Sequence, residues 1–251
     1  MKREARGVTK FLTALGAALL VLSSITWAAD DDKSDIEKRI QNAATVLDEI
    51  MSVKDKAIPD KIMSDAECIA VVPSMVKIAI GIGGNHGKGV ATCKTPNGWS
   101  APAPFSITGG SWGLQIGAQG VDLVMLVMNQ KGMDALLSSK FKVGADASAA
   151  AGPVGRQAAA DTDWKMKAEV LTYSRARGVF AGIDLNGSRI AQDKDETRIL
   201  FGKMVPFADI LGGKVEAPSG SQPFLSAVKK YTALTQTGSV TEPAPATQSA
   251  Q

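Results

Sequence analysis

The sequence predicts an α+β domain whose sheet is predominantly antiparallel and either strongly curved or folded into a barrel-like sandwich, with N- and C-terminal helices. Short runs of alternating apolar and polar residues follow one another between residues 68 and 190, separated by turn sequences. Glycines recur inside these runs, which favours bulges and curvature. Strands and helices do not alternate regularly, so a parallel α/β sheet is excluded.

The first 28 residues have the composition of a secretory signal peptide. A positively charged segment precedes an apolar run at residues 11–25, and small residues surround the expected cleavage site near Ala28 or Ala29. The apolar run is short for a membrane span, and three aspartates follow at residues 30–32. We expect an exported protein, periplasmic or secreted, which can also lie peripherally on a membrane. A retained N-terminal anchor is the alternative.

Removal of this leader makes the chain neutral. Residues 1–28 hold four of the 28 Lys and Arg residues and one of the 25 Asp and Glu residues, which leaves 24 of each. The basic charge of the full sequence therefore belongs largely to the leader. Nucleic-acid binding through net charge loses its support, and any anion site must be local.

A single domain is expected at residues 34–234, and it opens with an amphipathic helix. Ser34 and Glu37 fit a capping box, and apolar residues recur at helical spacing as far as Met51. Such a stripe normally packs on its own domain. Docking on a membrane surface is the alternative, although acidic and basic residues nearly balance on this helix.

Strands follow Pro59. We expect short strands at residues 68–72 and 76–82, a hairpin through residues 95–98, an edge or irregular strand after Pro102, and a central strand at 121–128. A short helix lies within residues 129–140, and a final amphipathic helix is expected at 221–234. Residues 235–251 are rich in Thr, Gln, Ser, Pro and Ala, which predicts a disordered tail.

The segment from Tyr173 to Ile190 reads as a glycine turn followed by a hairpin. The strand at residues 179–185 is followed by Asn186-Gly187, a sequence typical of type I′ turns, and the strand through Arg189 is expected to return along the first. The segment contains no residue suited to nucleophilic catalysis. It is either a binding surface or only part of the sheet.

The two cysteines, Cys68 and Cys93, are expected to form a disulfide, because export would take them into an oxidising compartment. The alternative is two small buried residues in separate strands. One histidine and two separated cysteines make a zinc site improbable, and no metal or cofactor is expected.

Two sequence patterns resemble enzyme motifs, but the sequence around each does not fit the structure that the motif requires. Residues 109–113 match the G-x-S-x-G nucleophile pattern, but the sequence that follows alternates as a strand, and His86 precedes the serine. The glycine-rich run at residues 81–89 lacks the spacing of a phosphate loop or dinucleotide fingerprint and reads as a glycine-rich hairpin or bulge. Asp161 and Asp163 are not distinguished from a solvated turn. A non-catalytic protein is expected.

Basic residues around the predicted hairpin are the better functional candidates. Composition alone favours a solvated sheet face over a binding site, because carboxylates are interspersed among them. The candidates are Arg156, Lys165, Lys167, Arg175, Arg177 and Arg189.

Several ordered motifs resemble the SYLF domain family over about residues 34–234. They are the glycine-proline segment at residues 152–156, the segment at 173–182, and the turn at 185–188, with shorter agreements at 99–102 and 209–211. Eukaryotic members of this family bind phosphoinositides and actin, and many bacterial members are exported. The family is not known for catalysis.

The resemblance implies a non-catalytic lipid-binding module that engages anionic, phosphoinositide-like headgroups at a membrane surface. Arg156, Arg175 and Arg177 occupy the family's basic positions, and residues 34–54 occupy the place of a lipid-engaging helix. Guanidinium contacts to lipid phosphates would supply the attraction. The alternative is a periplasmic protein that binds an envelope protein or has a structural role there, without a specific lipid ligand.

Overall fold

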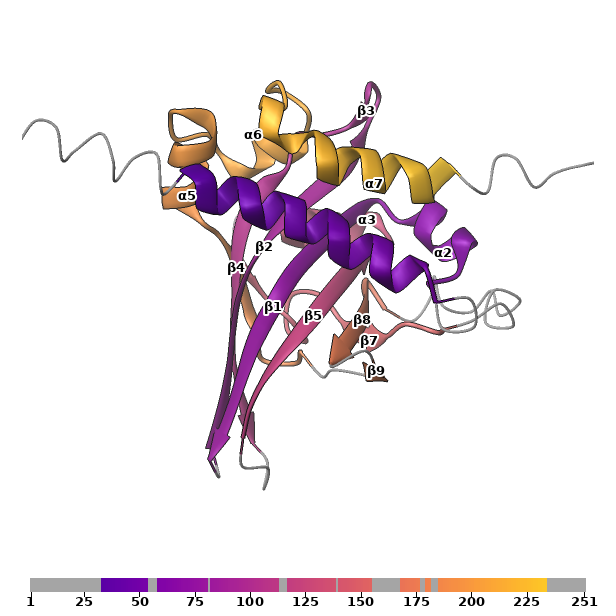
Figure 1. Ribbon diagram of the computed structural model, residues 1–251, viewed down its shortest axis with the longest axis vertical. Coiled ribbons are helices and arrows are strands. Elements are labelled where there is room, and N and C mark those ends of the chain that lie inside the picture. The colour runs from indigo at the N-terminus through magenta and orange to yellow at the C-terminus, as the bar shows by residue number, and fades with distance from the viewer. Residues whose placement is uncertain are drawn as a thin grey trace, which may run out of the picture.

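The computed structural model describes residues 33–53, 58–80, 82–112, 117–138, 140–154, 168–176, 179–181 and 185–233. Within these residues, ten strands form a curled, mostly antiparallel sheet, and helices from both ends of the chain cover one of its faces (Figure 1). The predicted α+β class is therefore confirmed. The predicted leader at residues 1–28 and the predicted tail at 235–251 lie outside the described residues.

The sheet has the strand order β6-β10-β4-β2-β1-β5-β8-β7, with β3 paired to β2 and β9 paired to β8. Among these strand pairs only β7 and β8 run parallel. The strands are β1 (Cys68–Ile80), β2 (Ile82–Thr95), β3 (Gly98–Trp99), β4 (Ala103–Trp112), β5 (Gly117–Val127), β6 (Lys140–Lys142), β7 (Ala149–Ala151), β8 (Val170–Ala176), β9 (Val179–Ala181) and β10 (Arg189–Gln192).

An N-terminal helix (residues 33–51) and a C-terminal helix, α7, cross the same face of the sheet, which we call the outer face (Figure 1). The inner face lies within the curl. The remaining helices are α2 (Asp60–Asp65), α3 (Gln130–Leu137), α5 (Lys194–Phe201) and α6 (Phe207–Leu211); a 3₁₀ turn, η2 (Ser219–Ser221), leads into α7 (Gln222–Ala233).

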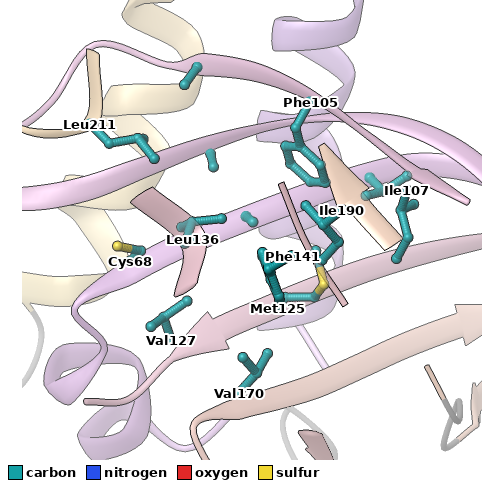
Figure 2. Close-up of a cluster of buried hydrophobic side chains, with 14 of the residues drawn as sticks. Cys68, Phe105, Ile107, Met125, Val127, Leu136, Phe141, Val170, Ile190 and Leu211 are labelled. Atoms are coloured by element: carbon teal, nitrogen blue, oxygen red, sulfur yellow. The ribbon is translucent and has the colours of Figure 1, made fainter. Parts of the chain in front are cut away.

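Each face of the sheet carries its own apolar core. On the inner face, side chains from β1, β4, β5, β8 and β10 meet those of Leu136 from α3, Phe141 from β6 and Leu211 from α6 (Figure 2). On the outer face, Val71, Leu126 and their neighbours pack against the helices. Because alternate strand residues face opposite sides, one strand serves both cores.

The apolar stripe of the N-terminal helix is buried against the outer face. Apart from Met51, which is partly buried, the stripe residues are exposed by 3% or less, so of the two alternatives, packing on its own domain is confirmed. They are Ile36, Ile40, Ala43, Ala44, Leu47 and Ile50.

The predicted break between two strands at Pro73 is wrong. A single strand, β1, continues through it, and the register with β2 shifts between Val71 and Val76. The strand therefore contains a β-bulge, in which Ser74 has a φ of 53° and donates its backbone N–H to a carboxylate oxygen of Asp122 at 3.0 Å. A bulge tolerates a proline because the residues in it leave the ladder.

The predicted hairpin around Asn186-Gly187 is also wrong in its pairing. A turn is present, closed by a 2.8 Å hydrogen bond from the Ser188 N–H to the Leu185 carbonyl. Only Gly187 has a positive φ there, of 82°, which fits a type II turn instead of type I′. After the turn, β10 pairs with β4 and β6, while β9 pairs with β8.

Cys68 and Cys93 form a disulfide, which confirms the predicted pairing. They are directly opposite one another on β1 and β2, and both belong to the inner core. The alternative of two buried cysteines in separate strands is correct about burial but omits the bond.

Three groups of ion pairs hold the N-terminal helix to the rest of the fold. Near its start, Arg39 binds Glu196 of α5; near its end, Glu49 binds Arg175 of β8. Between them, Asp48 accepts hydrogen bonds from Lys230 at 3.0 Å and from Tyr231 at 2.6 Å, both on α7. These contacts flank the buried stripe on both sides.

Removal of the disulfide should destabilise the domain. The bridge closes a loop of about 26 residues, and the loss of such a cross-link costs about 3 kcal/mol through the entropy of the unfolded chain. We expect Cys68→Ala/Cys93→Ala to lower the free energy of unfolding by about this amount in urea titrations. Reductant should lower the stability of the parent protein and leave the variant unchanged; equal responses would contradict the prediction.

Arg175 should contribute to stability, whereas Arg189 should not. Arg175→Ala leaves Glu49 and the largely buried Asp122 without their partner, and we expect a loss of about 1–2 kcal/mol in the free energy of unfolding. Arg189 is exposed and makes no ion pair among the described residues, so Arg189→Ala is the matched control. Equal stabilities of the two variants would refute the structural role of Arg175.

Candidate functional site

The structure describes two of the six predicted lipid-binding residues. Arg175 lies on β8 and Arg189 on β10. The other four fall outside the described residues, and their role stays a prediction: Arg156, Lys165, Lys167 and Arg177.

Arg175 is engaged within the fold. Its guanidinium lies 3.1 Å from a carboxylate oxygen of Asp122 and also binds Glu49, and 18% of its side chain is exposed. Burial opposes its charge, but the hydrogen bonds to the two carboxylates outweigh burial and raise the pKa of Arg175. An external anion would have to compete with both carboxylates for this guanidinium.

Arg189 lies in an exposed row that crosses five strands of the outer face. Residues directly opposite on neighbouring strands share a face, and the paired registers define this row, which we call the cation row. Its members are Lys142 on β6, Arg189 on β10, Thr108 on β4, His86 on β2 and Val76 on β1. All five are exposed, and Val76 is 45% exposed.

The positive charge is concentrated at the β6 end of the cation row. Lys140 lies two residues from Lys142 on the same face of β6, and Phe141 between them is buried in the inner core. No ion pair engages the side chains of Lys140, Lys142 or Arg189 within the described part of the chain. Asp146 lies beside them, but its carboxylate accepts the backbone N–H of Lys142 at 2.7 Å.

Lys88, the next outward lysine on β2, differs from these three cations. Its ammonium lies 2.9 Å from Asp193 and 2.9 Å from Glu196. Burial disfavours the charge, but these two carboxylates hold the pKa of Lys88 above its usual value. Lys88 therefore links β2 to α5, and its charge is already compensated.

Lys140, Lys142 and His86 were missed by the sequence reasoning. Their spacing contained one usable signal, since Lys140 and Lys142 flank Phe141 with the period of two that places both on one face. Their proximity to Arg189 could not be predicted from the sequence, because the pairing of β6 with β10 joins segments about 47 residues apart.

Two of the segments that carry the family resemblance, at residues 152–156 and 173–182, come into contact in the fold through Gly152 and Tyr173. A side chain at Gly152 would overlap the ring and hydroxyl of Tyr173, so only glycine allows β7 to lead so closely past β8. Burial raises the pKa of the Tyr173 hydroxyl far above its usual range. At the base of β7, Glu169 accepts hydrogen bonds from Ser148 and Lys131, which lower the pKa of Glu169 to about 2. These residues act in packing.

The nucleophile pattern at residues 109–113 has no catalytic geometry in the described residues. Ser111 lies within β4, paired with Gly83 of β2, and not at a strand-to-helix junction. His86 pairs with Thr108, three residues before Ser111 in β4. Of the helices in the described residues, none is both long and apolar enough to cross a membrane.

Comparison with known proteins agrees with the motifs. The Ysc84 family model, described as Las17-binding protein actin regulator, matches residues 108–231. SH3 domain-containing YSC84-like protein 1 of Rattus norvegicus is 29% identical over 206 residues, which are 79% of this chain and 60% of the relative. LAS seventeen-binding protein 3 of Saccharomyces cerevisiae is 31% identical over 176 residues, 67% of this chain and 38% of the relative.

The chain thus spans about 60% of the length of the mammalian relatives and less of the yeast protein. The likeness covers the domain described here and leaves the rest of those proteins without a counterpart in the alignment. Ordered motifs, the family model and the relatives all coincide on the same domain, and the chain belongs to the Ysc84-type, or SYLF, family.

Proposed function

We propose that this protein is a non-catalytic module that binds anionic phospholipid surfaces, with phosphoinositide-like headgroups as its preferred class. The single observation that supports it most is the group of exposed cations formed by Lys140, Lys142 and Arg189. Guanidinium and ammonium groups bind phosphate oxygens through charge-assisted hydrogen bonds. These three cations make no ion pair among the described residues, so they have no internal partner to lose on binding.

The size of the expected attraction suits a peripheral interaction. Each Lys or Arg near an anionic membrane surface contributes about 1 kcal/mol. Three such residues would supply about 3 kcal/mol, or roughly a hundredfold preference for anionic over neutral vesicles. Attraction of this size weakens as salt screens the charges.

We also propose that the protein acts after export, in the periplasm or outside the cell. The signal-peptide pattern of residues 1–28 supports this, and so does the Cys68–Cys93 bridge, since disulfides persist in oxidising compartments.

A protein ligand is the second candidate. The names of the yeast relative and of the family refer to binding of Las17 and to actin regulation. An envelope protein could use the same exposed cations. Recovery of one specific partner from envelope extract, together with absence of vesicle binding, would favour this candidate.

Vesicle co-sedimentation tests the proposed lipid binding. Lys142→Gln/Arg189→Gln should weaken binding to vesicles of phosphatidylcholine with phosphatidylserine or phosphatidylinositol phosphate by about 30-fold, because two cations near the surface are lost. The matched control is Lys203→Gln/Lys229→Gln, which removes the same charge from exposed positions at the helical end of the fold.

Binding by the parent protein should decrease as salt is raised, and pure phosphatidylcholine should bind weakly. No sedimentation with anionic vesicles at low salt would reject the proposed function. Equal loss in the two double variants would reject the site, because the effect would then follow net charge alone.

A further inference from the structure

A row of polar residues crosses the inner face of the sheet next to the apolar inner core, and we call it the inner polar row. Lys77 lies directly opposite Asn85 and Gln119 on the neighbouring strands, and Asn85 lies opposite Gly109. Ser188, immediately before β10, completes the row beside Gly109. On β1, β4 and β5 each member stands two residues from a member of the inner core, so the row shares that face.

Two side-chain oxygens of this row are buried without a hydrogen-bond partner. Asn85 is exposed by 4% and Ser188 by 1%. Neither the amide oxygen of Asn85 nor the hydroxyl oxygen of Ser188 is hydrogen-bonded within the described part of the chain. Burial of a polar atom without a partner costs free energy, so such atoms are rare unless a ligand or a water molecule bonds to them. Two of them in one place therefore indicate a binding site.

The two oxygens converge over Gly109. A side chain at Gly109 would overlap both the Ser188 hydroxyl and the Asn85 amide oxygen, so only glycine leaves them room. They come from distant parts of the chain and reach this point from the two strands that flank β4. An amide oxygen accepts hydrogen bonds, whereas a hydroxyl both donates and accepts them. Together the two groups can bind a hydroxyl group of a ligand.

Lys77 places a positive charge beside this pair of oxygens. Its side chain is partly buried and lies directly opposite Asn85. The bulge in β1 puts it there, because one extra residue in a strand exchanges the faces of the residues beyond it. Exposed Gln119, on the other side of Lys77, adds an amide that can donate and accept. The inner polar row contains no carboxylate.

Other partly buried cations that the structure describes have partners within the fold. Arg39, Lys88 and Arg175 bind carboxylates. Lys94 donates to a backbone carbonyl oxygen at 2.6 Å. Lys77 makes no ion pair among the described residues, so an external anion can bind its ammonium group without displacing a carboxylate.

We propose that the inner polar row binds a small anion that carries hydroxyl groups, of the polyol phosphate or hydroxy acid class. Lys77 binds the anionic group through charge-assisted hydrogen bonds, while a hydroxyl of the ligand donates to Asn85 and accepts from Ser188. The assignment follows from the groups themselves, because an ammonium group only donates and an amide oxygen only accepts. The site lies on the face of the sheet opposite to the cation row and does not depend on the proposed function.

A ligand reaches the two buried oxygens from the side of Lys77 and Gln119. These are the more exposed polar side chains of the row, whereas the oxygens of Asn85 and Ser188 are shielded from solvent. Lysine has a flexible four-carbon side chain, so rotation of Lys77 is the smallest change that admits a ligand. Binding should therefore change the surroundings of the Asn85 amide.

The side-chain amide signal of Asn85 in a heteronuclear NMR spectrum tests this inference on the folded protein. Asn85→Ser identifies the signal by its loss. Glycerol phosphate, which combines an anionic group with hydroxyls, should shift the signal. Inorganic phosphate alone and glycerol alone should each bind about tenfold more weakly, because each makes only part of the contacts. The signal reports on the inner face, so phosphate bound at the cation row does not affect it.

Substitutions in the row provide a second measurement. Lys77→Gln should weaken glycerol phosphate binding by about tenfold or more, as expected for the loss of a charge-assisted hydrogen bond. The matched control is Lys203→Gln at an exposed position away from the row, which should leave binding unchanged. Ser188→Ala should weaken binding without lowering the resistance to urea, because the hydroxyl oxygen has no partner within the described residues. A purely structural hydroxyl would lower that resistance when removed.

Two results would overturn the inference. One is an Asn85 signal that glycerol phosphate leaves unchanged, or that still shifts equally in Lys77→Gln. The other is a crystal structure, grown with glycerol phosphate, in which one ordered water alone bridges Asn85 and Ser188. Short-chain phosphatidylglycerol identifies the source of the ligand: the same shift indicates a lipid headgroup and no shift a free soluble anion, and both agree with the inference when glycerol phosphate binds.

Discussion

The bulge in β1 is the constraint on which the rest of the structure depends. It adds one residue between Val71 and Val76 and so changes which later residues of β1 face outward. Asp122 holds it, accepting the Ser74 N–H with one carboxylate oxygen and pairing with Arg175 through the other. Before the bulge, alternate residues of β1 supply two apolar cores. After it, the same strand continues past the helices to its end at Ile80 (Figure 1).

Asp122 consequently connects three parts of the molecule. The bulge, β8 and, through the shared Arg175, Glu49 of the N-terminal helix all depend on one carboxylate. This explains why the most prominent arginine of the sequence pattern is a structural residue. Its charge is required where two strands and a helix converge. Arg189 lies on the same outer face but toward the opposite edge of the sheet, and of the two predicted residues that the structure describes it is the exposed one.

Local patterns in the sequence were sufficient for the elements but not for their partners. The central strand β5 was recognisable from its apolar run, and the short helix α3 and the C-terminal helix from the spacing of their apolar residues. The partner of β10 was not, because the Asn186-Gly187 turn predicts a local hairpin, whereas Ile190 completes the inner core beside Phe141 and Ile107. Burial of an apolar side chain decides the pairing there, and it joins segments far apart in sequence.

Sheet topology also explains how far the domain extends beyond the family model. That model begins at residue 108, within β4, yet β1 and β2 lie between β4 and β5 in the sheet. Residues 68–95 therefore cannot be separated from the matched segment without opening both cores. The alignments with the mammalian relatives, which cover 206 residues, agree with a domain of this larger size.

The residues that carry the family resemblance and the residues of the proposed binding surface have different roles. Gly152 and Tyr173 pack against one another, and Ser100 is buried and accepts the backbone N–H of Cys93. Such residues preserve the curl of the sheet whichever ligand is bound. The cation row lies on the part of the sheet that the helices leave uncovered, and its five side chains are exposed. Relatives can therefore share this fold and signature while they differ in the surface or partner that they recognise.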